Sequence, residues 1–291
     1  MKVFTNFGIL YSNLNAEFYT FAAPGMQGVA TYTVINPDAN YDGELRLRSR
    51  TFRRQDEIKN PYALSTSVGF ERQLPWDSKI SVTYNHRKTL DNFKGTNERL
   101  NSTDVVQIYN NDGSHTYDGI EFVVRKYVSR GFDLLAHYTL AKAEGDTTSI
   151  LSPLQQRFQY GPQDWDQRHT VVVSGNFFLP LDLRLTVLSR YASGRPYSIT
   201  NDLPGVEAAW VDPRGNPVNR NNERMPANAT VDLSFGRAFK TRHGAFTPTL
   251  EIINLTNRVN ITGVSSSFSS VGVPVNADTS RLMQVGLEWK F

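Results

Sequence analysis

The densest group of residues that could do chemistry is the segment Asp164-Trp165-Asp166-Gln167-Arg168-His169. Its two carboxylates and its imidazole could hold a metal ion or act as a general acid and base. The segment also lies where a long polar stretch runs into a predicted strand, so Asp166 could instead pair with Arg168, and Trp165 could sit in an aromatic belt at a membrane surface. We favour this structural interpretation of a loop-to-strand cluster formed by Asp164, Trp165, Asp166, Arg168 and His169.

Other residues with catalytic or ligand chemistry show no useful spacing. The chain has no cysteine, which excludes disulfides and thiolate-based zinc or iron–sulfur sites. The histidines lack the spacing of metal ligands; they are His86, His115, His137, His169 and His243. The sequence holds no glycine-rich phosphate loop, nucleophile elbow or pair of catalytic carboxylates. We therefore expect no enzymatic activity, no cofactor, and no catalytic, cofactor-binding or metal site.

The composition narrows the class of protein. The chain has 291 residues with a net charge of +3, and its mean hydropathy is −0.42. No stretch approaches the ~20 apolar residues that a membrane helix needs, so a helical membrane protein is excluded. A transmembrane β-barrel is compatible with these values, because its strands alternate apolar and polar residues and its loops are polar.

Apolar residues recur at every second position along much of the chain, and helical periodicity is almost absent. This pattern predicts β-strands, so strands must position any functional side chains. In the segment 183–191, for example, one face carries Leu183, Leu185, Val187 and Tyr191, while the other begins with Arg184. We predict ten strands, near residues 3–11, 62–73, 79–88, 116–127, 132–142, 168–179, 183–193, 229–238, 245–255 and 281–291.

The predicted connections alternate between short and long. Tight turns are expected at 74–78, 128–131, 179–182 and 240–244, and long polar connections at 12–61, 89–115, 143–167, 194–228 and 256–280. Outer-membrane barrels have short periplasmic turns and long extracellular loops, whereas a soluble sandwich would scatter its loop lengths over both ends. The sequence thus predicts an all-β fold: an antiparallel portion of a transmembrane β-barrel in the bacterial outer membrane.

The last strand gives the clearest barrel pattern. One face carries only apolar residues, and the chain stops on an aromatic; these residues are Met283, Val285, Leu287, Trp289 and Phe291. The other face is Gln284, Gly286, Glu288 and Lys290. A barrel in lipid needs apolar residues outside and polar residues inside. We interpret the five apolar residues as a signal read by the barrel assembly machinery, with an ordinary edge strand as the alternative.

Basic residues gather in the run 46–54, Arg-Leu-Arg-Ser-Arg-Thr-Phe-Arg-Arg. Arginines beside an aromatic residue could bind nucleic acid, but a strand or loop face that meets anionic lipopolysaccharide or acidic residues fits the alternation better. Arg184 and Arg190 could line a solute path; paired charge inside a filled barrel is the interpretation that we prefer. We expect outer-membrane lipid and lipopolysaccharide as partners, and no nucleic acid.

In the order and spacing of several segments, the chain resembles the C-terminal half of TonB-dependent outer-membrane receptors, specifically the Oar-like group. The resembling segments are Asn60-Pro61-Tyr62, 64–75, Tyr117-Asp118-Gly119-Ile120-Glu121-Phe122, 131–132, 138–143, Asp166-Gln167-Arg168-His169, Ser193-Gly194-Arg195-Pro196-Tyr197, Asn254-Leu255-Thr256-Asn257 and the last strand. They span about 60–291, and residues 1–59 fit more loosely.

The resemblance implies a receptor that takes up or binds a bulky ligand without covalent chemistry. Members have a barrel of about 22 strands, an N-terminal plug, and a segment that engages the TonB protein. Residues 1–291 have room for about ten strands, and the segment that starts at Met1 does not look like a secretory signal. We therefore expect the C-terminal part of a receptor barrel, which meets the TonB system only through N-terminal parts that are absent.

A barrel portion leaves unpaired backbone groups on its two edge strands, each of which costs several kcal/mol in hydrocarbon. We predict an open, curved antiparallel sheet, without contact between the strand near Phe7 and the strand that ends at Phe291.

Two alternatives to a receptor barrel remain. The size also fits a complete ten-stranded outer-membrane protease of the omptin type, with Asp164, Asp166 and His169 at its rim. The other alternative is a soluble β-domain that binds carbohydrate.

Overall fold

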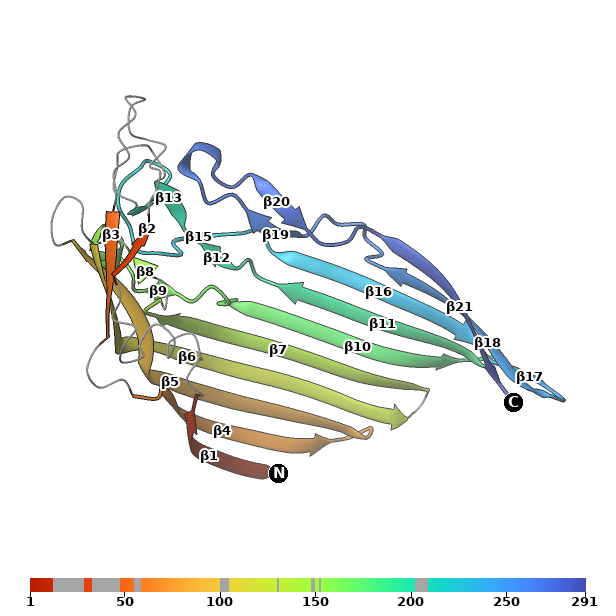
Figure 1. Cartoon of the computed structure of the whole chain (residues 1–291). Helices are drawn as coiled ribbons and strands as arrows, with labels where there is room; N and C mark the ends of the chain where they lie inside the picture. Colours follow the sequence, from red (N-terminus) through yellow and green to blue (C-terminus); the bar gives the residue numbers. More distant parts are fainter. Residues whose placement is uncertain are drawn as a thin grey trace.

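The computed structural model describes residues 1–12, 29–32, 48–54, 59–99, 105–129, 131–147, 150–151, 153–201 and 209–291. Ten long strands form one antiparallel sheet in which each strand pairs with its neighbour in this order (Figure 1). They are β1 (Lys2–Tyr11), β4 (Tyr62–Leu74), β5 (Ser78–Arg99), β6 (Val105–Ser129), β7 (Phe132–Gly145), β10 (His169–Leu179), β11 (Leu183–Ala192), β16 (Asn228–Arg237), β18 (Gly244–Ile253) and β21 (Leu282–Lys290). All ten predicted strands are confirmed.

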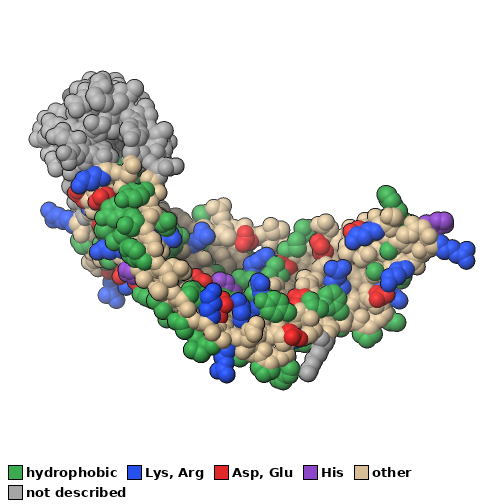
Figure 2. Space-filling view, turned by 90° about the horizontal axis from the view of Figure 1, so that it is seen from below, with side chains coloured by type: hydrophobic (Ala, Val, Ile, Leu, Met, Phe, Trp, Pro, Cys, Tyr) green, Lys and Arg blue, Asp and Glu red, His purple; other side chains and the backbone are tan. Residues whose placement is uncertain are grey.

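The sheet is open. Within the described chain, β1 pairs only with β4 and β21 pairs only with β18, and these edges lie on opposite sides of the sheet (Figure 1). Their side chains are largely uncovered, as Phe7 at 70% exposure and Val285 at 79% illustrate. The expectation that the strand near Phe7 does not meet the strand ending at Phe291 is confirmed. Figure 2 shows the resulting curvature, with the molecule hollowed on one side.

Two strands are longer than we predicted. We expected a loop at 89–115, but β5 continues to Arg99 and β6 begins at Val105, with irregular pairing between Thr89 and Lys94. This segment is rich in Asn, Asp and Gly, which reads as loop in isolation. Continued pairing between the two strands outweighs these local preferences, because the backbone groups of each strand satisfy those of the other.

The predicted long connections also contain short elements. In 12–61 lie β2 (Val29–Tyr32) and β3 (Arg48–Arg54), and β3 pairs in parallel with β6. The backbone of the predicted basic run thus forms a strand from residue 48 onward, while its side chains, and with them the expected contact with lipopolysaccharide, lie outside what the structure describes. The others are β8 (Ile150–Leu151), α2 (Pro153–Arg157), β9 (Gly161–Pro162), β12 (Pro196–Tyr197), β13 (Ile199–Asn201), β14 (Ala209–Val211), β15 (Glu223–Arg224), β19 (Ile261–Val264), η1 (Phe268–Ser270) and β20 (Pro274–Ala277). The short strand β17 (Phe239–Thr241) instead lies between β16 and β18, at the predicted tight turn, and pairs with β18.

The two ends of the sheet differ as predicted, and we call them the turn end and the loop end. At the turn end, β4 joins β5 through Pro75–Asp77 and β10 joins β11 through Pro180–Asp182. Trp76 and Asp77 have positive φ angles of 63° and 54°, and Leu181 and Asp182 have 66° and 58°. Successive left-handed residues match the twist of the flanking strands, which is what a tight hairpin requires.

Alternation along each strand gives the sheet two faces. Register brings Val82, Phe122, Tyr138, Val171 and Tyr191 into one row, on the side that we call the apolar face. The next row, on what we call the polar face, includes Ser81, Val123, His137, Val172 and Arg190. No helix among the described residues has the length and apolar character needed to cross a membrane.

At the loop end, a second layer packs against the sheet; we call residues 153–168, 194–201 and 209–226 the rim layer. Its small apolar core consists of Ile199, Ala209 and Val211, which are at most 3% exposed, and Leu154 and Tyr197 pack against them. The antiparallel strand pair β13 and β14 supplies all three core residues.

Candidate functional site: the polar face and its rim

The polar face carries connected side chains rather than isolated charges. The Asn85 amide donates to Glu121 Oε1 at 3.0 Å, and Glu121 Oε2 lies 3.8 Å from His137 Nε2. Farther along the sheet, Asn176 donates to Asp133 at 3.0 Å and accepts from the Thr186 hydroxyl at 2.8 Å. These contacts link five neighbouring strands, namely β5, β6, β7, β10 and β11, so the face is a polar surface with fixed side chains.

The charge pairing that we preferred for the polar face is confirmed at Arg190. Its guanidinium donates to Asp232 Oδ2 at 3.0 Å across β11 and β16. Arg184 lies on the same face, opposite Phe178 and Gly236. Since Arg190 is already paired, its charge is partly neutralised rather than free to attract an anion.

A cavity of about 530 Å³ lies at the loop end, next to β1. Aromatic and charged side chains both line it, including Trp165, Tyr117, Arg87, His115 and Glu121. The rings of Trp165 and Tyr117 lie 5.9 Å apart at 37°. Our prediction of Trp165 in an interface belt is wrong, because this ring packs on the polar face and not on the apolar one. The cavity therefore offers aromatic surface, a cation and a carboxylate to a solute on the polar face.

Asp166 is held by residues far away in the sequence. It is 2% exposed, and one carboxylate oxygen accepts from the Ala143 amide at 2.6 Å. The ion pair that we expected with Arg168 is wrong: the partner is Arg224, whose guanidinium donates to Asp166 Oδ2 and to its backbone oxygen. Asp166 thereby ties the rim layer to the end of β7. The neighbour Arg168 contributes its backbone oxygen, which accepts from Ala141.

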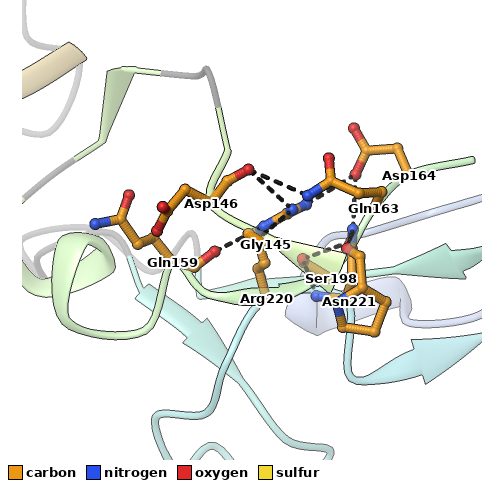
Figure 3. A network of polar contacts seen from close by, with 9 residues as sticks. Gly145, Asp146, Gln159, Gln163, Asp164, Ser198, Arg220 and Asn221 are labelled. Carbon is orange, nitrogen blue, oxygen red and sulfur yellow. Dashed lines mark hydrogen bonds and ion pairs between the residues drawn. The ribbon is translucent and has the colours of Figure 1, made fainter. Parts of the chain in front are cut away.

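Arg220 forms the centre of a polar network in the rim layer (Figure 3). The residue is 3% exposed. Its guanidinium donates to the backbone oxygens of Gln159 at 2.7 Å and Gly145 at 3.1 Å, and to Asp164 Oδ1 at 3.3 Å. Burial lowers the pKa of Arg220, and the charges of Asp164 and Asp146 act in the opposite direction. A charge at this depth is tolerated because carbonyl and carboxylate oxygens surround it.

Asn221 extends the same network on the other side of Asp164. Its amide donates to Asp164 Oδ1 and to the Pro162 oxygen, both at 2.7 Å, and its backbone N–H donates to Ser198 Oγ at 2.7 Å. The sequence analysis did not identify three residues of the rim layer that bind Asp164 or Asp166, namely Arg220, Asn221 and Arg224. Their side chains meet partners more than fifty residues away, as the separations of 75 for Arg220–Gly145 and 58 for Arg224–Asp166 illustrate. No local spacing signals such contacts.

The structure separates the three residues of the omptin alternative. Asp164 accepts from Arg220 and Asn221, and Asp166 is buried against Arg224. His169 instead contacts Tyr138, with Nδ1 2.9 Å from the hydroxyl and the rings at 11°. Tyr138 belongs to the apolar face, so His169 points away from the rim layer. The described part of the chain contains no group of three His, Cys, Asp or Glu side chains placed to hold a metal ion.

A close backbone contact explains the segment Ser193-Gly194-Arg195-Pro196-Tyr197. A Cβ atom on Gly194 would lie 1.6 Å from the Met225 backbone oxygen, so only glycine fits. The Gly194 oxygen also accepts from Arg224 at 3.1 Å. The close approach at Gly194 therefore positions β15, which carries Arg224, so that Arg224 reaches Asp166.

The last strand lies uncovered at its edge of the sheet. Met283, Val285, Leu287, Trp289 and Phe291 are 49–103% exposed. The Trp289 ring stacks on Phe246 at 5.8 Å, and Phe246 stacks on Phe239 at 4.9 Å, which fixes the strand on one side. No other strand of the described residues pairs with β21 on its far side.

With this architecture in place, comparison with known proteins identifies the class. Residues 5–202, more than half of the chain, match the family of the outer membrane beta barrel domain, so the chain belongs to this family. The protein is thus a β-barrel protein of the bacterial outer membrane. No curated protein matches the sequence.

Solved structures of transport proteins share the fold. The outer membrane transporter YddB from Escherichia coli is 14% identical with a TM-score of 0.60, and the match covers 84% of this chain and 34% of that one. The ferric-catecholate import receptor Fiu from E. coli is 13% identical with a TM-score of 0.56, covering 98% and 32%. The FrpB iron transporter from Neisseria meningitidis is 15% identical with a TM-score of 0.55, covering 81% and 32%. The chain spans about one third of the length of these proteins.

Proposed function

We propose that residues 1–291 are the C-terminal part of the barrel of a TonB-dependent receptor of the Oar-like group. The observation that carries the proposal is the match of nearly the whole sheet to one third of outer-membrane transport receptors. The ordered segments from Asn60 to the last strand support it from the sequence side. The function that follows is TonB-dependent uptake or surface binding of a bulky ligand, without covalent chemistry.

In this function the polar face forms part of the wall of the solute path. The cavity beside β1 is the candidate ligand contact, because Trp165 and Tyr117 offer ring surface next to Arg87. Aromatic rings and a guanidinium suit a large ligand with planar and anionic parts. Neighbours that carry ferric catecholate and ferripyoverdine are consistent with this chemistry.

The partners are divided between two parts of the receptor. Coupling to the TonB protein belongs to N-terminal parts of the family, while the last strand addresses the barrel assembly machinery. For that signal we propose the exposed apolar side chains of β21 together with the chain's final aromatic, namely Met283, Val285, Leu287, Trp289 and Phe291.

The test compares cells that carry the gene with a deletion strain. Surface binding and uptake of radioactive iron are measured with ferric catecholate and ferric pyoverdine chelates, with and without a functional TonB protein. We expect TonB-dependent uptake that is lost on deletion and reduced at least several-fold by the pair of substitutions Arg87→Gln and Trp165→Ala.

The matched control is Arg190→Gln, which changes a paired arginine of the polar face outside the cavity. Unchanged uptake in the cavity variant alongside normal amounts of protein would contradict the ligand contact. Uptake that persists without TonB would overturn the receptor assignment.

A further inference from the structure

A second cavity, of about 300 Å³, lies at the loop end where β16 begins, and we call it the β16 cavity. Its walls come from the segment before β10, the segment after β11, the start of β16 and the β19–β20 pair. None of the described residues that line it also lines the cavity beside β1, so the two are separate. Its polar side chains are Gln167, Arg195, Asn228, Thr262 and Asp278.

Backbone contacts hold the walls of the β16 cavity in place. Asn260, which is 1% exposed, binds both backbone groups of Ala229 through its side chain, accepting at 2.8 Å and donating at 3.0 Å. The Asn260 backbone oxygen accepts from the Asp278 N–H at 2.8 Å, and the Met225 N–H donates to the Arg195 oxygen at 2.9 Å. The backbones of Arg195 and Asp278 are therefore fixed without any contribution from their own side chains.

The Asn228 side chain presents an acceptor that the described part of the chain does not use. Its Oδ1 is buried and has no hydrogen-bond partner among the described residues. A buried amide oxygen normally accepts a hydrogen bond, because it has lost its contact with bulk water. Nearby, Gln167 Nε2 donates to the Ser193 oxygen at 3.0 Å, which fixes the Gln167 amide at the cavity wall. The cavity is thus prepared for a ligand that carries N–H or O–H donors.

Two opposite charges line the β16 cavity without neutralising each other. Among the described residues, neither the Arg195 guanidinium nor the Asp278 carboxylate has an ion-pair or hydrogen-bond partner, and both residues are exposed. A simple anion would be repelled by Asp278, and a simple cation by Arg195. A ligand with one charge of each sign would meet a complementary group at both places.

We propose that the β16 cavity binds a small zwitterion of the amino-acid type, namely a free amino acid or a dipeptide. Arg195 pairs with the ligand's carboxylate, while Asp278 and Asn228 Oδ1 accept from its ammonium group. The volume of about 300 Å³ is ample for such a ligand, since a water molecule takes ~30 Å³ in the liquid. Met225 and Ile261 offer apolar contact to the ligand's side chain. The site is separate from the cavity beside β1, so it does not rest on the proposed uptake.

The first test measures binding of L-alanine and of L-alanyl-L-alanine to the full 291-residue chain in neutral detergent micelles, by isothermal titration calorimetry. The N-acetylated dipeptide lacks the ammonium charge, and the dipeptide amide lacks the carboxylate. Each blocked form should bind at least tenfold more weakly than the free dipeptide. Absence of binding by both zwitterions, or equal binding of the blocked and free forms, would overturn the proposal.

The second test assigns the two charges to residues. Arg195→Gln and Asp278→Asn should each weaken binding of the free dipeptide at least tenfold. Arg195→Gln should not weaken binding of the dipeptide amide further, because the group that Arg195 contacts is already missing. The matched control is Asp182→Asn/Arg242→Gln, which removes one exposed charge of each sign at the turn end and should bind like the native chain.

Circular dichroism of each variant separates loss of binding from loss of fold. A folded Arg195→Gln or Asp278→Asn variant that binds the free dipeptide as tightly as the native chain would contradict the assignment. A loss of equal size in the turn-end control would contradict it too, because it would show that only the overall charge balance matters.

Discussion

The membrane sheet and the rim layer are stabilised in different ways. In the sheet, neighbouring strands pair in sequence order, and side chains alternate between an apolar and a polar face. In the rim layer, buried polar side chains such as Asp166 and Arg220 join segments that are far apart in the chain. The comparison teaches that backbone pairing can build the sheet without a buried core, whereas the rim layer depends on a few specific polar contacts.

The largest effect is expected from a charge on the lipid-facing side of the sheet. Val187→Arg puts a guanidinium on the apolar face of β11 and should lower the free energy of unfolding in a bilayer by about 2–4 kcal/mol. The neighbouring substitution Leu188→Arg, on the polar face beside Asp232, should cost far less. Chemical denaturation of both variants in lipid vesicles measures the difference, and equal losses would mean that the two faces are wrongly assigned.

In the rim layer, removal of the central guanidinium should have the next largest effect. Arg220→Leu leaves the Gln159 and Gly145 oxygens and the Asp164 carboxylate without their donor, which costs on the order of 3 kcal/mol locally. Amide hydrogen exchange should rise at 153–168 but stay unchanged in β10 and β11. Arg214→Leu, at an exposed loop position, serves as the control. Faster exchange throughout the sheet would show that the two regions are not independent.

A smaller loss of stability is expected from a substitution that disturbs only the close contact between the backbones of Gly194 and Met225. Gly194→Ala forces the Met225 backbone to move, at a cost of about 1–3 kcal/mol. Gly8→Ala on the edge strand β1 meets nothing within 4 Å and should be tolerated. Limited proteolysis between 194 and 226 would report the opening. Identical proteolysis of both variants would contradict the close packing at Gly194.

The smallest effect concerns pH at the edge of the rim layer. The Asn216 side chain and backbone N–H both donate to Asp212, and the backbone N–H of Arg214 does so too, which lowers the pKa of Asp212 below 3.8. Because the folded pKa is the lower one, the stabilisation is complete above the unfolded value. It is lost as the pH falls through the folded pKa.

Amide hydrogen exchange of the turn 212–216, measured at mildly acidic and at strongly acidic pH, tests the role of Asp212. The turn should open locally at the strongly acidic pH and stay closed at the mildly acidic pH. Asp212→Asn should remove the pH dependence, since an amide does not titrate here. A turn that opens equally in the native chain and in the variant would assign the change to another group.

The strands and their faces could be predicted because the determining signal is local. Each of the ten strands carries its own period-two pattern, and hairpin order follows from the short turns, as between Leu74 and Ser78. The extension of β5 and β6 beyond Thr89 and His115 was missed. There the composition favours loops, and only the partner strand makes the extended conformation stable.

The sequence by itself determined the membrane-facing pattern, including the apolar residues of the last strand. Only the tertiary structure decided which groups meet at the rim: Asp166 with Arg224 instead of Arg168, and Trp165 with Tyr117 on the polar face. The physical reason is range. Alternation acts between adjacent residues and paired strands, whereas a buried charge takes whichever partner the folded chain brings within hydrogen-bonding distance.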